Sequence, residues 1–455
     1  MQMLEKVLGF LGDIVWGPPL LILIVGTGIY LTFRLGFLQV RMLPYSLKLA
    51  FSKRQDNNSE GDISHFKALM TAMAATVGVG NIVGVAGAVV VGGPGAIFWM
   101  WMSAFFGMAT KYGEAILAVK YRVTDANGQM AGGPMYYIEK GLKLKWLAVL
   151  FALFGSIAAF GIGNGTQAQA VAGVVSQTWN IPTWVTGIVL MIAAALVILG
   201  GIKSIGNVTA FFVPIMAVFY LVAGLIIILT NLPQIPAALG LIFSDAFTGQ
   251  AVAGGAIGTV IRYGVARGVF SNEAGLGSAP IAAAAAKTDM PGRQALVSMT
   301  QVFIDTILIC SITGLTIVMS GLYDSGLEGS ELTAAAFSEF LGGFGPIVVS
   351  IGLIFFATST IFGWAYYGEK CFQYLFRNPK AIYIYRILFV LVVPIGATAS
   401  LDIVWTFSDV ANGMMAIPNL IGLLGLSGVI AFETKRIMAK VKEEKNGVVS
   451  SDEAA

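Results

Sequence analysis

The chain has 455 residues, of which 57% are hydrophobic and only 11% are charged, and its mean hydropathy is +0.82. An ordinary soluble domain carries about 25% charged residues, so this composition excludes a soluble globular protein. The formal net charge of +3 carries little information as a total. With two cysteines and a single histidine, the chain offers neither a disulfide framework nor a histidine-based metal site or catalytic triad.

Apolar stretches of about 20 residues recur along the chain, and each is long enough to cross a bilayer as a helix. They predict an all-α membrane protein with eleven transmembrane helices, called spans 1 to 11 below. The spans are expected at 15–33, 68–90, 95–118, 146–173, 182–200, 207–230, 252–286, 294–320, 345–373, 381–401 and 406–432.

Lysine and arginine gather in alternate loops. The loops that follow span 1 and span 3 and the tail after Glu433 are rich in both, whereas the loops near 91–94, 174–181, 231–250, 321–331 and 402–405 contain neither. Basic residues favour the cytoplasmic side of a membrane. The pattern therefore predicts a multi-pass protein of the cell membrane with its N-terminus outside and its C-terminus in the cytoplasm.

Two spans contain closely spaced glycines beside polar residues, at Thr76–Asn81 in span 2 and at Ser271–Ser278 in span 7. Glycine weakens a helix by about 1 kcal/mol relative to alanine, so both segments invite an unwound stretch. Within lipid such a stretch survives only when it is buried or lines a wet cavity. Freed N–H groups then suit a carboxylate and freed carbonyls suit Na⁺. The alternative interpretation is a pair of small-residue packing faces.

The two interrupted spans occupy matching positions in the chain. Span 2 opens one set of five spans and span 7 opens a second set, and because five is odd the two sets have opposite orientations. This is an inverted repeat, an arrangement typical of secondary transporters. Four regions follow: an extra N-terminal helix and loop at 1–66, a first repeat at 67–230, a second repeat at 231–432 and a cytoplasmic tail at 433–455.

Three segments together resemble the alanine or glycine:cation symporter family, a group with the LeuT-type fold. They are Gly78-Val79-Gly80-Asn81, the Gly-Gly-Pro-Gly-Ala-Ile-Phe-Trp-Met-Trp run at 92–101, and the Phe-Ser-Asn-Glu-Ala-Gly-Leu-Gly-Ser-Ala-Pro run at 270–280. The resemblance covers nearly the whole chain. It implies Na⁺-driven uptake of alanine or glycine into the cell by alternating access.

The resemblance also implies an ion-binding set. Span 9 carries a hydroxyl cluster that is similar to the Na⁺-binding hydroxyls of this fold, although hydroxyls in a helix also bond to their own backbone. The expected cation ligands are Ala74, Val77, Asn81, Ser271, Thr358, Ser359 and Thr360.

A substrate-binding set follows in the same way. The gap in span 2 offers main-chain amides to the substrate carboxylate, and the backbone of the gap in span 7 receives its ammonium group. Phe270 walls the pocket and Trp364 caps it, which favours small substrates. The expected substrate-binding residues are Thr76, Val77, Gly78, Gly80, Asn164, Gln167, Gln169, Phe270, Asn272, Glu273, Gly275 and Trp364. For the three polar residues of span 4, at 164, 167 and 169, helix–helix hydrogen bonding is an equal alternative.

Charged residues inside membrane spans are functional by default. One interpretation makes Glu273 in span 7 or Asp305 in span 8 a cation ligand, and another pairs Glu273 with an arginine as a gate or strut. Lys111 and Glu114 of span 3 are expected near the cytoplasmic surface, where long side chains either reach the interface or form ion pairs. The same location is expected for Glu369 and Lys370 of span 9.

Sodium is therefore the expected coupling ion, without an organic cofactor, and the expected partners are a small amino acid and membrane lipid. No nucleic acid or obligatory protein partner is indicated. A proton-coupled symporter of the same fold remains open because of the two buried carboxylates. An ion channel is the alternative from another class, although the chain shows no selectivity-filter loop. An enzyme is not expected, since neither a His-Glu-x-x-His nor a Gly-x-Ser-x-Gly motif occurs.

Overall fold

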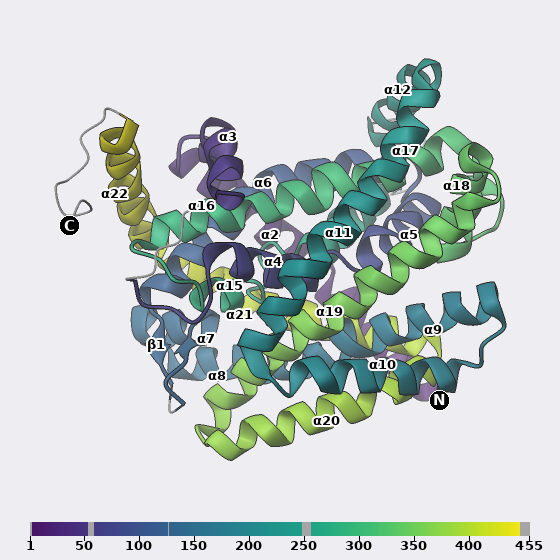
Figure 1. The fold of residues 1–455 in the computed structure, drawn as a ribbon. Coiled ribbons are helices and arrows are strands. Elements are labelled where there is room, and N and C mark those ends of the chain that lie inside the picture. Colours follow the sequence, from purple (N-terminus) through teal and green to yellow (C-terminus); the bar gives the residue numbers. More distant parts are fainter. Residues whose placement is uncertain (1, 53–58, 126, 248–255, 446–455) are drawn as a thin grey trace.

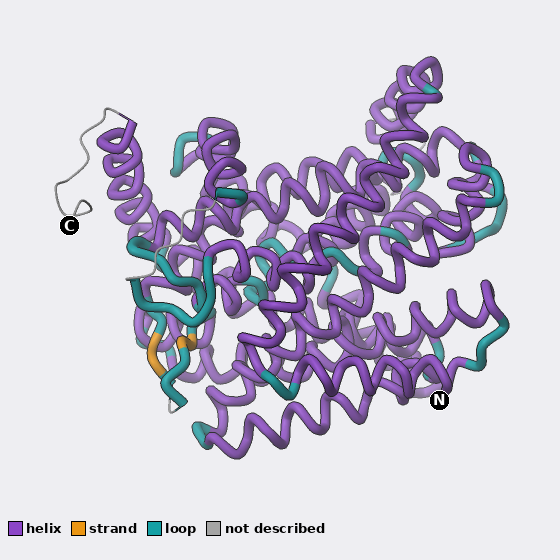
Figure 2. The backbone as a smooth tube through the Cα atoms, viewed as in Figure 1, coloured by secondary structure: helices purple, strands orange, loops and turns teal. Residues whose placement is uncertain are grey.

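The computed structural model describes residues 2–52, 59–125, 127–247 and 256–445 (Figure 1). Helices dominate this part of the chain, and loops only interrupt them (Figure 2). The one sheet among the described residues is an antiparallel hairpin of β1 (Val123–Thr124) and β2 (Met130–Ala131). An isolated parallel bridge joins Ile63 to Ala286.

The helices of the first half span the N-terminal segment and the predicted first repeat. They are α1 (Gln2–Val15), α2 (Pro18–Arg34), α3 (Leu38–Ala50), α4 (His65–Thr76), η1 (Val79–Asn81), α5 (Val83–Gly92), α6 (Ala96–Lys120), α7 (Pro134–Tyr137), η2 (Ile138–Leu142), α8 (Lys145–Phe160), η3 (Gly161–Gly165), α9 (Thr166–Trp179), α10 (Thr183–Ile198) and α11 (Gly201–Thr230).

The helices of the second half follow. They are η4 (Leu232–Gln234), α12 (Ile235–Phe247), α14 (Ala256–Asn272), α15 (Pro280–Ala284), α16 (Pro291–Val302), η5 (Phe303–Cys310), α17 (Ser311–Ser320), η6 (Leu322–Asp324), α18 (Gly329–Leu341), α19 (Phe344–Phe376), α20 (Pro379–Thr398), α21 (Leu401–Gly425) and α22 (Ser427–Lys445).

The described helices include five that are long and apolar enough to cross a membrane, or seven if each of two bent pairs forms one span. The remaining predicted spans correspond to shorter, broken or more polar helices, so the count of eleven stays a prediction. The beginning of span 7, at 252–255, lies outside the described residues. The boundaries of the four predicted regions also stay a prediction.

The end of span 11 was predicted wrongly. The apolar run was expected to continue to residue 432, but α21 ends at Gly425 and the chain bends by 64° before α22. Helix α22 carries Lys435, Arg436 and several further charged residues. It therefore does not continue the apolar helix α21 that precedes it.

Several short helices lie where only loops were expected. They are α1, α3, α12 and α18. A search for apolar stretches of about 20 residues cannot find them, because each has 14 residues or fewer.

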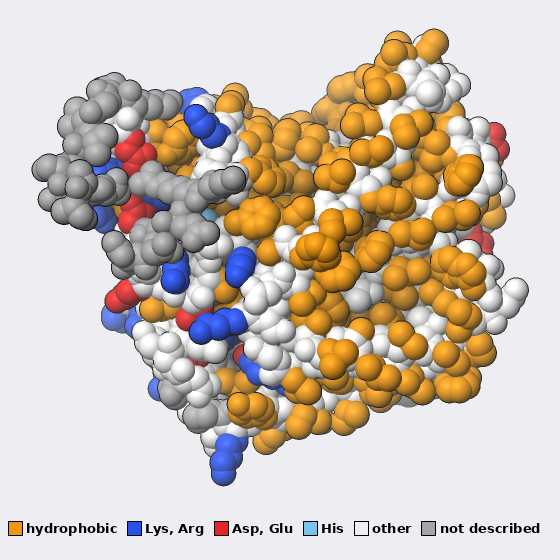
Figure 3. Space-filling model, viewed as in Figure 1, with side chains coloured by type: hydrophobic (Ala, Val, Ile, Leu, Met, Phe, Trp, Pro, Cys, Tyr) orange, Lys and Arg blue, Asp and Glu red, His pale blue; other side chains and the backbone are white. Residues whose placement is uncertain are grey.

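Hydrophobic side chains cover most of the visible face, whereas charged side chains gather mainly at the end that holds β1 and α22 (Figures 1 and 3). Ion pairs connect the basic loops there: Lys120 lies 2.6 Å from Glu433, and Arg293 lies 2.8 Å from Glu444. The loops that were predicted to share one side of the membrane therefore do share one end of the molecule.

Candidate substrate and ion site

Span 2 is broken at the predicted glycines. Helix α4 ends at Thr76, and Val77 and Gly78 then adopt extended conformations before the short turn η1. Two freed amides are satisfied by side chains: Gly78 N–H donates to Asn81 Oδ1 at 2.9 Å, and Val79 N–H donates to Gln167 Oε1 at 3.1 Å. The break is thus held open by one residue of its own segment and one from α9.

Span 7 is broken between α14 and α15. Glu273, Gly275 and Gly277 all have positive φ angles, of 58°, 91° and 84°, a region that glycine reaches without steric cost. Their segment is anchored by α6, since Glu114 Oε1 accepts hydrogen bonds of 3.1 Å from both glycine amides. Asn419 of α21 donates to the same oxygen at 2.7 Å and to the Gly275 carbonyl at 2.8 Å.

The two breaks touch each other. A Cβ atom added at Gly80 would lie 3.1 Å from Ser271 Cα and 3.3 Å from Phe270 Cδ1. Only a residue without a side chain lets the two backbones approach this closely. Carbonyl and amide groups freed in both spans therefore lie in one buried region.

The predicted hydroxyl cluster of span 9 lies against the first break. Thr360 Oγ1 is 2.9 Å from the Ala74 carbonyl and 3.4 Å from that of Val77, and Ser359 Oγ is 3.5 Å from Ala74 O. Both hydroxyls also bond the Phe356 carbonyl of their own helix at 2.9 Å. Thr358 Oγ1, by contrast, has no hydrogen-bond partner among the described residues.

A second polar cluster surrounds the buried carboxylate of Asp305, in a stretch of π-helix. Asn81 Nδ2 donates to Oδ1 at 2.8 Å, and Ser271 and Thr306 hydroxyls donate to Oδ2 at 2.8 Å each. Asn272 joins through a 3.1 Å bond to Thr306. The cluster connects spans 2, 7 and 8, so Asp305 is the group on which the predicted ligands Asn81 and Ser271 converge.

The location of Lys111 and Glu114 was predicted wrongly from the sequence. They were expected near the cytoplasmic surface, but their exposed fractions are 1% and 0%, and both lie on α6 beside the second break. Glu273 is buried there as well, accepting a 2.7 Å bond from Ser278. Hydropathy gives the length of a span but not the depth at which the neighbouring helices place a charged residue.

The three polar residues of span 4 make different contacts. Asn164 donates to the Phe389 carbonyl at 2.7 Å and so connects helices, while Gln167 also donates to Ile162 O at 2.8 Å. Gln169 lines a cavity instead.

Two further predicted substrate residues lie on other spans. Thr76 Oγ1 accepts a 3.0 Å bond from Gln301, and Trp364 is buried against Gly163 and Tyr367.

A cavity of about 430 Å³ opens on one side of the breaks. It is lined by residues that follow the first break, by Gln169 and Gln177 of α9, and by the first turn of α18. Its wall includes Arg267 and Trp405. The Trp405 ring stacks on Phe270 at 5.0 Å, and Arg267 pairs with Asp409 at 3.1 Å. Phe270 therefore separates this cavity from the region where the breaks meet.

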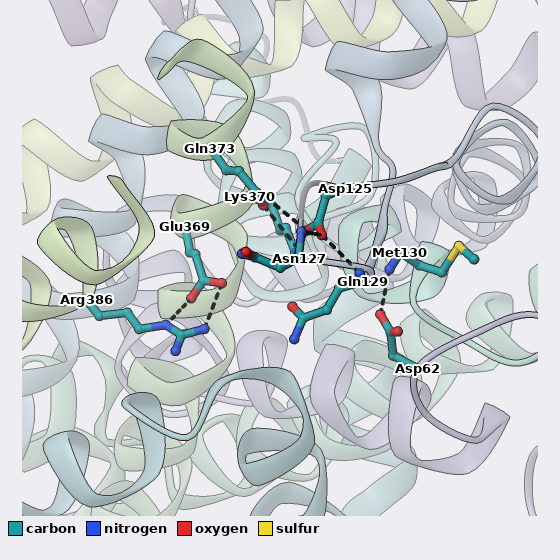
Figure 4. A network of polar contacts seen from close by, with 9 residues as sticks. All are labelled: Asp62, Asp125, Asn127, Gln129, Met130, Glu369, Lys370, Gln373 and Arg386. Atoms are coloured by element: carbon teal, nitrogen blue, oxygen red, sulfur yellow. Dashed lines mark hydrogen bonds and ion pairs between the residues drawn. The ribbon is translucent and has the colours of Figure 1, made fainter. Parts of the chain in front are cut away.

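On the opposite side, polar contacts join the loop after β1 to α19, beside a second cavity of about 500 Å³ that Asp125 and Gln373 help to line (Figure 4). Asp125, after β1, accepts hydrogen bonds of 2.8 Å from Lys370 and 2.9 Å from Gln373 of α19. The neighbouring Glu369 binds Arg386 through both oxygens, at 2.6 and 3.0 Å. Glu369 and Lys370 are thus paired, as one of the two alternatives expected, although both side chains are fully buried.

Arg122 joins the two segments that lie next to the broken spans. Its guanidinium donates to the carbonyls of Ala284 and Ala286, just after the second break, at 3.1 and 2.7 Å. It also donates to Glu60 O at 2.8 Å, ahead of the first break. Asp62 accepts a 2.8 Å bond from the Met130 amide, so the hairpin ties the same segments a second time.

The two loop carboxylates differ in pKa. Burial raises the pKa of Asp62 above its ordinary value. Burial acts in the same direction on Asp125, but the hydrogen bond and charge of Lys370, with the Gln129 amide, outweigh it and leave the pKa of Asp125 lowered. Asp125 is therefore ionised throughout the neutral range and holds Lys370 as a salt bridge.

Broken helices whose freed backbone meets buried polar side chains define a membrane transporter of the secondary type. The sequence model described as "Sodium:alanine symporter family" matches residues 1–451, so the chain belongs to that family. Its relatives and its fold neighbours are transporters, not enzymes.

Among curated relatives, the sodium/alanine symporter AgcS of Methanococcus maripaludis is 62% identical over 92% of this chain and 94% of its own. An uncharacterised transporter of Haemophilus influenzae is 52% identical over 96% and 97%. The probable sodium/glutamine symporter GlnT of Bacillus subtilis is 38% identical over 99% and 94%.

Solved structures support the fold alone. The crystal structure of MhsT in complex with L-phenylalanine matches with a TM-score of 0.59 at 14% identity, over 84% of this chain and 99% of that one. A variant of the Eremococcus coleocola manganese transporter matches with a TM-score of 0.52 at 13% identity, over 88% and 93%. The predicted LeuT-like, all-α membrane fold is confirmed.

Proposed function

We propose that the chain takes alanine and glycine into the cell together with Na⁺, by alternating access across the cell membrane, with its N-terminus outside. The observation that carries this proposal is the meeting of the two breaks at Gly80 and Ser271. Both breaks offer backbone groups at one place, so a zwitterion and a cation can share the same unwound segments. Each ligand then orders the backbone that the other needs, which couples their binding.

Two cation sites are proposed at the clusters beside the breaks. The first uses the carbonyls of Ala74 and Val77 with the hydroxyls of Ser359 and Thr360, and the second uses Asn81, Ser271 and Asp305. Oxygen ligands suit a hard cation such as Na⁺. In the first cluster the short hydroxyl–carbonyl contacts already bring the oxygens of spans 2 and 9 together.

The substrate site is proposed in the region where the two breaks meet, which Phe270 separates from the cavity. The main chain from Val77 to Gly80 receives the carboxylate, and that of the second break receives the ammonium group. The family includes relatives named for alanine and for glutamine, so the size of the pocket decides the substrate. The bulk of Phe270 and Trp364 favours alanine and glycine.

Radiolabelled alanine uptake into proteoliposomes tests the proposal. An imposed Na⁺ gradient should drive accumulation, whereas a H⁺ gradient of equal size should not. Accumulation driven by H⁺ alone would favour the proton-coupled alternative, which the buried carboxylates of Glu273 and Asp305 keep open. A substrate-independent, non-saturable ion conductance would instead indicate a channel.

Thr360→Ala tests the first cation site. Losing the hydroxyl that lies 2.9 Å from the Ala74 carbonyl should raise the Na⁺ concentration for half-maximal alanine uptake by about tenfold, the equivalent of one hydrogen bond to a charged group. Thr358→Ala is the matched comparison, because that hydroxyl makes no hydrogen bond to the described residues of the break. An equal Na⁺ dependence in the two variants would contradict the assignment of Thr360.

Trp364→Ala tests the substrate pocket. Removing the indole, which is buried against Gly163 and Tyr367, should admit larger neutral amino acids such as leucine as competitors of alanine uptake. Competition is measured with unlabelled amino acids of increasing size. Unchanged selectivity in a folded, active variant would remove Trp364 from the pocket.

A further inference from the structure

Lys111 lies beside the second break with no direct partner. One turn before it, a Cβ atom at Gly107 would lie 2.9 Å from the Ala274 Cβ, and Thr110 is 3.7 Å from the position of a Cβ at Gly275. This stretch of α6 therefore packs directly on the unwound backbone. The Lys111 side chain is 1% exposed, so its amine is held in the protein interior next to the break.

Three buried carboxylates interact electrostatically with this amine: Glu114, Glu273 and Asp305. Lys111 Nζ makes no hydrogen bond to any described residue, and one oxygen each of Glu114 and Glu273 is also unpaired. One amine thus interacts with three carboxyl groups. A buried charge without a bonded counter-charge is costly, which is unusual for a residue whose role is only structural.

Structural ion pairs elsewhere in the chain look different. Lys370 bonds Asp125 at 2.8 Å, and Arg386 bonds Glu369 through two nitrogens. Each of those cations has a bonded carboxylate partner, whereas Lys111 is shared and bonded to none. The flexible stem of lysine lets its charge move among several acceptors.

We propose that Lys111 is a tethered cation that offsets the carboxylates around the second break and thereby weakens Na⁺ binding at Asp305. The inference rests on the proposed function, because it concerns the proposed Asp305 cation site. An arriving Na⁺ meets the attraction of Asp305 and Glu273 together with the repulsion of Lys111. Lys111 is therefore a positioning residue that tunes the affinity so that the ion can be released after each cycle.

A charge role predicts opposite effects for two substitutions. Lys111→Met removes a repulsive charge and should lower the Na⁺ concentration for half-saturation about fivefold, because like charges repel each other more strongly inside a protein than in water. Glu273→Gln removes an attractive charge and should raise it. The double variant K111M/E273Q restores the net charge and should return near wild type.

The experiment measures binding of radioactive sodium to the purified full-length protein in detergent, without alanine. Lys111→Arg is the matched control, because it keeps the charge and should stay within about twofold of wild type. If Lys111→Met does not fold, the comparison of K111M/E273Q with E273Q alone gives the same answer, a lower half-saturating concentration when Lys111 is absent.

The outcomes separate the two proposals. Absence of saturable Na⁺ binding in the wild type would overturn the proposed sodium coupling itself. Normal binding in the wild type with no change in Lys111→Met, or weaker binding in both single variants, would overturn the role of Lys111 alone. A merely structural lysine would not give opposite shifts that cancel in the double variant.

Discussion

Gly78 lies where the Thr360 side chain of span 9 reaches the first break. Its missing side chain leaves room for the Thr360 hydroxyl, which would lie 2.4 Å from an added Cβ atom, and for Gln167 Oε1 at 3.1 Å. Glycine at this position therefore does more than weaken the helix. It lets the hydroxyl of α19 reach the carbonyls that the break has freed.

Gly78→Ala should consequently displace Thr360 and raise the Na⁺ concentration for half-maximal alanine uptake by about tenfold or more, because an atom cannot be accommodated at 2.4 Å without movement of the neighbour. Uptake in proteoliposomes at varied Na⁺ measures the shift.

Gly84→Ala is the control for this substitution. It lies on α5, where an added Cβ atom has nothing within 4 Å, so its Na⁺ dependence should match that of wild type. Equal shifts in the two variants would mean that loss of glycine flexibility, rather than the collision with Thr360, is responsible.

The residues next to the breaks could be found from the sequence, whereas their supports could not. Asn81 and Ser271 lie within or beside glycine-rich segments, and local composition draws attention to them. Glu114 and Asn419 hold the second break from α6 and α21, far away in the chain. Both Glu114 and Asn419 stand out in the sequence as polar residues in apolar helices. The sequence does not indicate which backbone groups their side chains would bind.

At the scale of elements, the sequence predicted where helices stop more reliably than how their ends are held. Glycine pairs predicted both breaks correctly because backbone freedom is a local property. The bend between α21 and α22 and the short helix α12 depend on packing and on the bilayer surface. The hairpin of β1 and β2 was likewise missed, since two residues per strand leave no periodic pattern.

The hairpin loop is fastened to α19 by a salt bridge whose strength should depend on pH. Asp125→Asn leaves the ammonium of Lys370, which is fully buried, without a counter-charge, at a cost of about 3–5 kcal/mol. The variant should therefore unfold at a lower temperature than wild type at neutral pH.

The direction of the pH effect follows from the lowered pKa of Asp125. A carboxylate whose pKa is lower in the folded state than in the unfolded state stabilises the fold. This contribution is complete when the pH is above the ordinary pKa of 3.8, and it is lost as the pH falls through the lower pKa of the folded state. The gap between wild type and Asp125→Asn should stay constant from about pH 8 to pH 5 and narrow below about pH 4. Thermal unfolding in detergent measures it.

Glu139→Gln is the matched control for the hairpin. Glu139 pairs with Arg377 at 3.4 Å, and the Arg377 side chain is 64% exposed, so the pair contributes little. A loss of stability as large as that of Asp125→Asn would show that the effect comes from any charge lost at this end of the molecule.

The whole molecule is asymmetric about the two breaks. One side holds the cavity lined by α5, α9 and α18, and on the other side the polar contacts of Asp125 border a second cavity of about 500 Å³ (Figure 4). Sequence patterns predicted which loops share an end, because basic residues mark them. They could not predict the contacts of Arg122 that hold this end together, since these are made with backbone carbonyls, which every sequence possesses.

Arg122 is the residue whose loss should open the closed end. Its guanidinium joins the segment before the first break to the segment after the second, through Glu60, Ala284 and Ala286. Arg122→Ala removes these three bonds and keeps the bridge between Ile63 and Ala286 with its flanking backbone bonds. The segment that precedes α4 and the segment that follows α15 should then separate more often, and this separation would expose the buried residues of α15.

A cysteine at Ala283, which is buried in α15, reports this opening in a background where Cys310 and Cys371 are replaced by alanine. A membrane-impermeant maleimide applied from the side of the basic loops should label it several times faster in Arg122→Ala than in the parent. Arg377→Ala, which removes an exposed ion pair with Glu139 and a cation–π contact with Tyr374, should leave the rate unchanged. Equal labelling in all three proteins would mean that Arg122 does not hold this end closed and that the backbone bridge alone suffices.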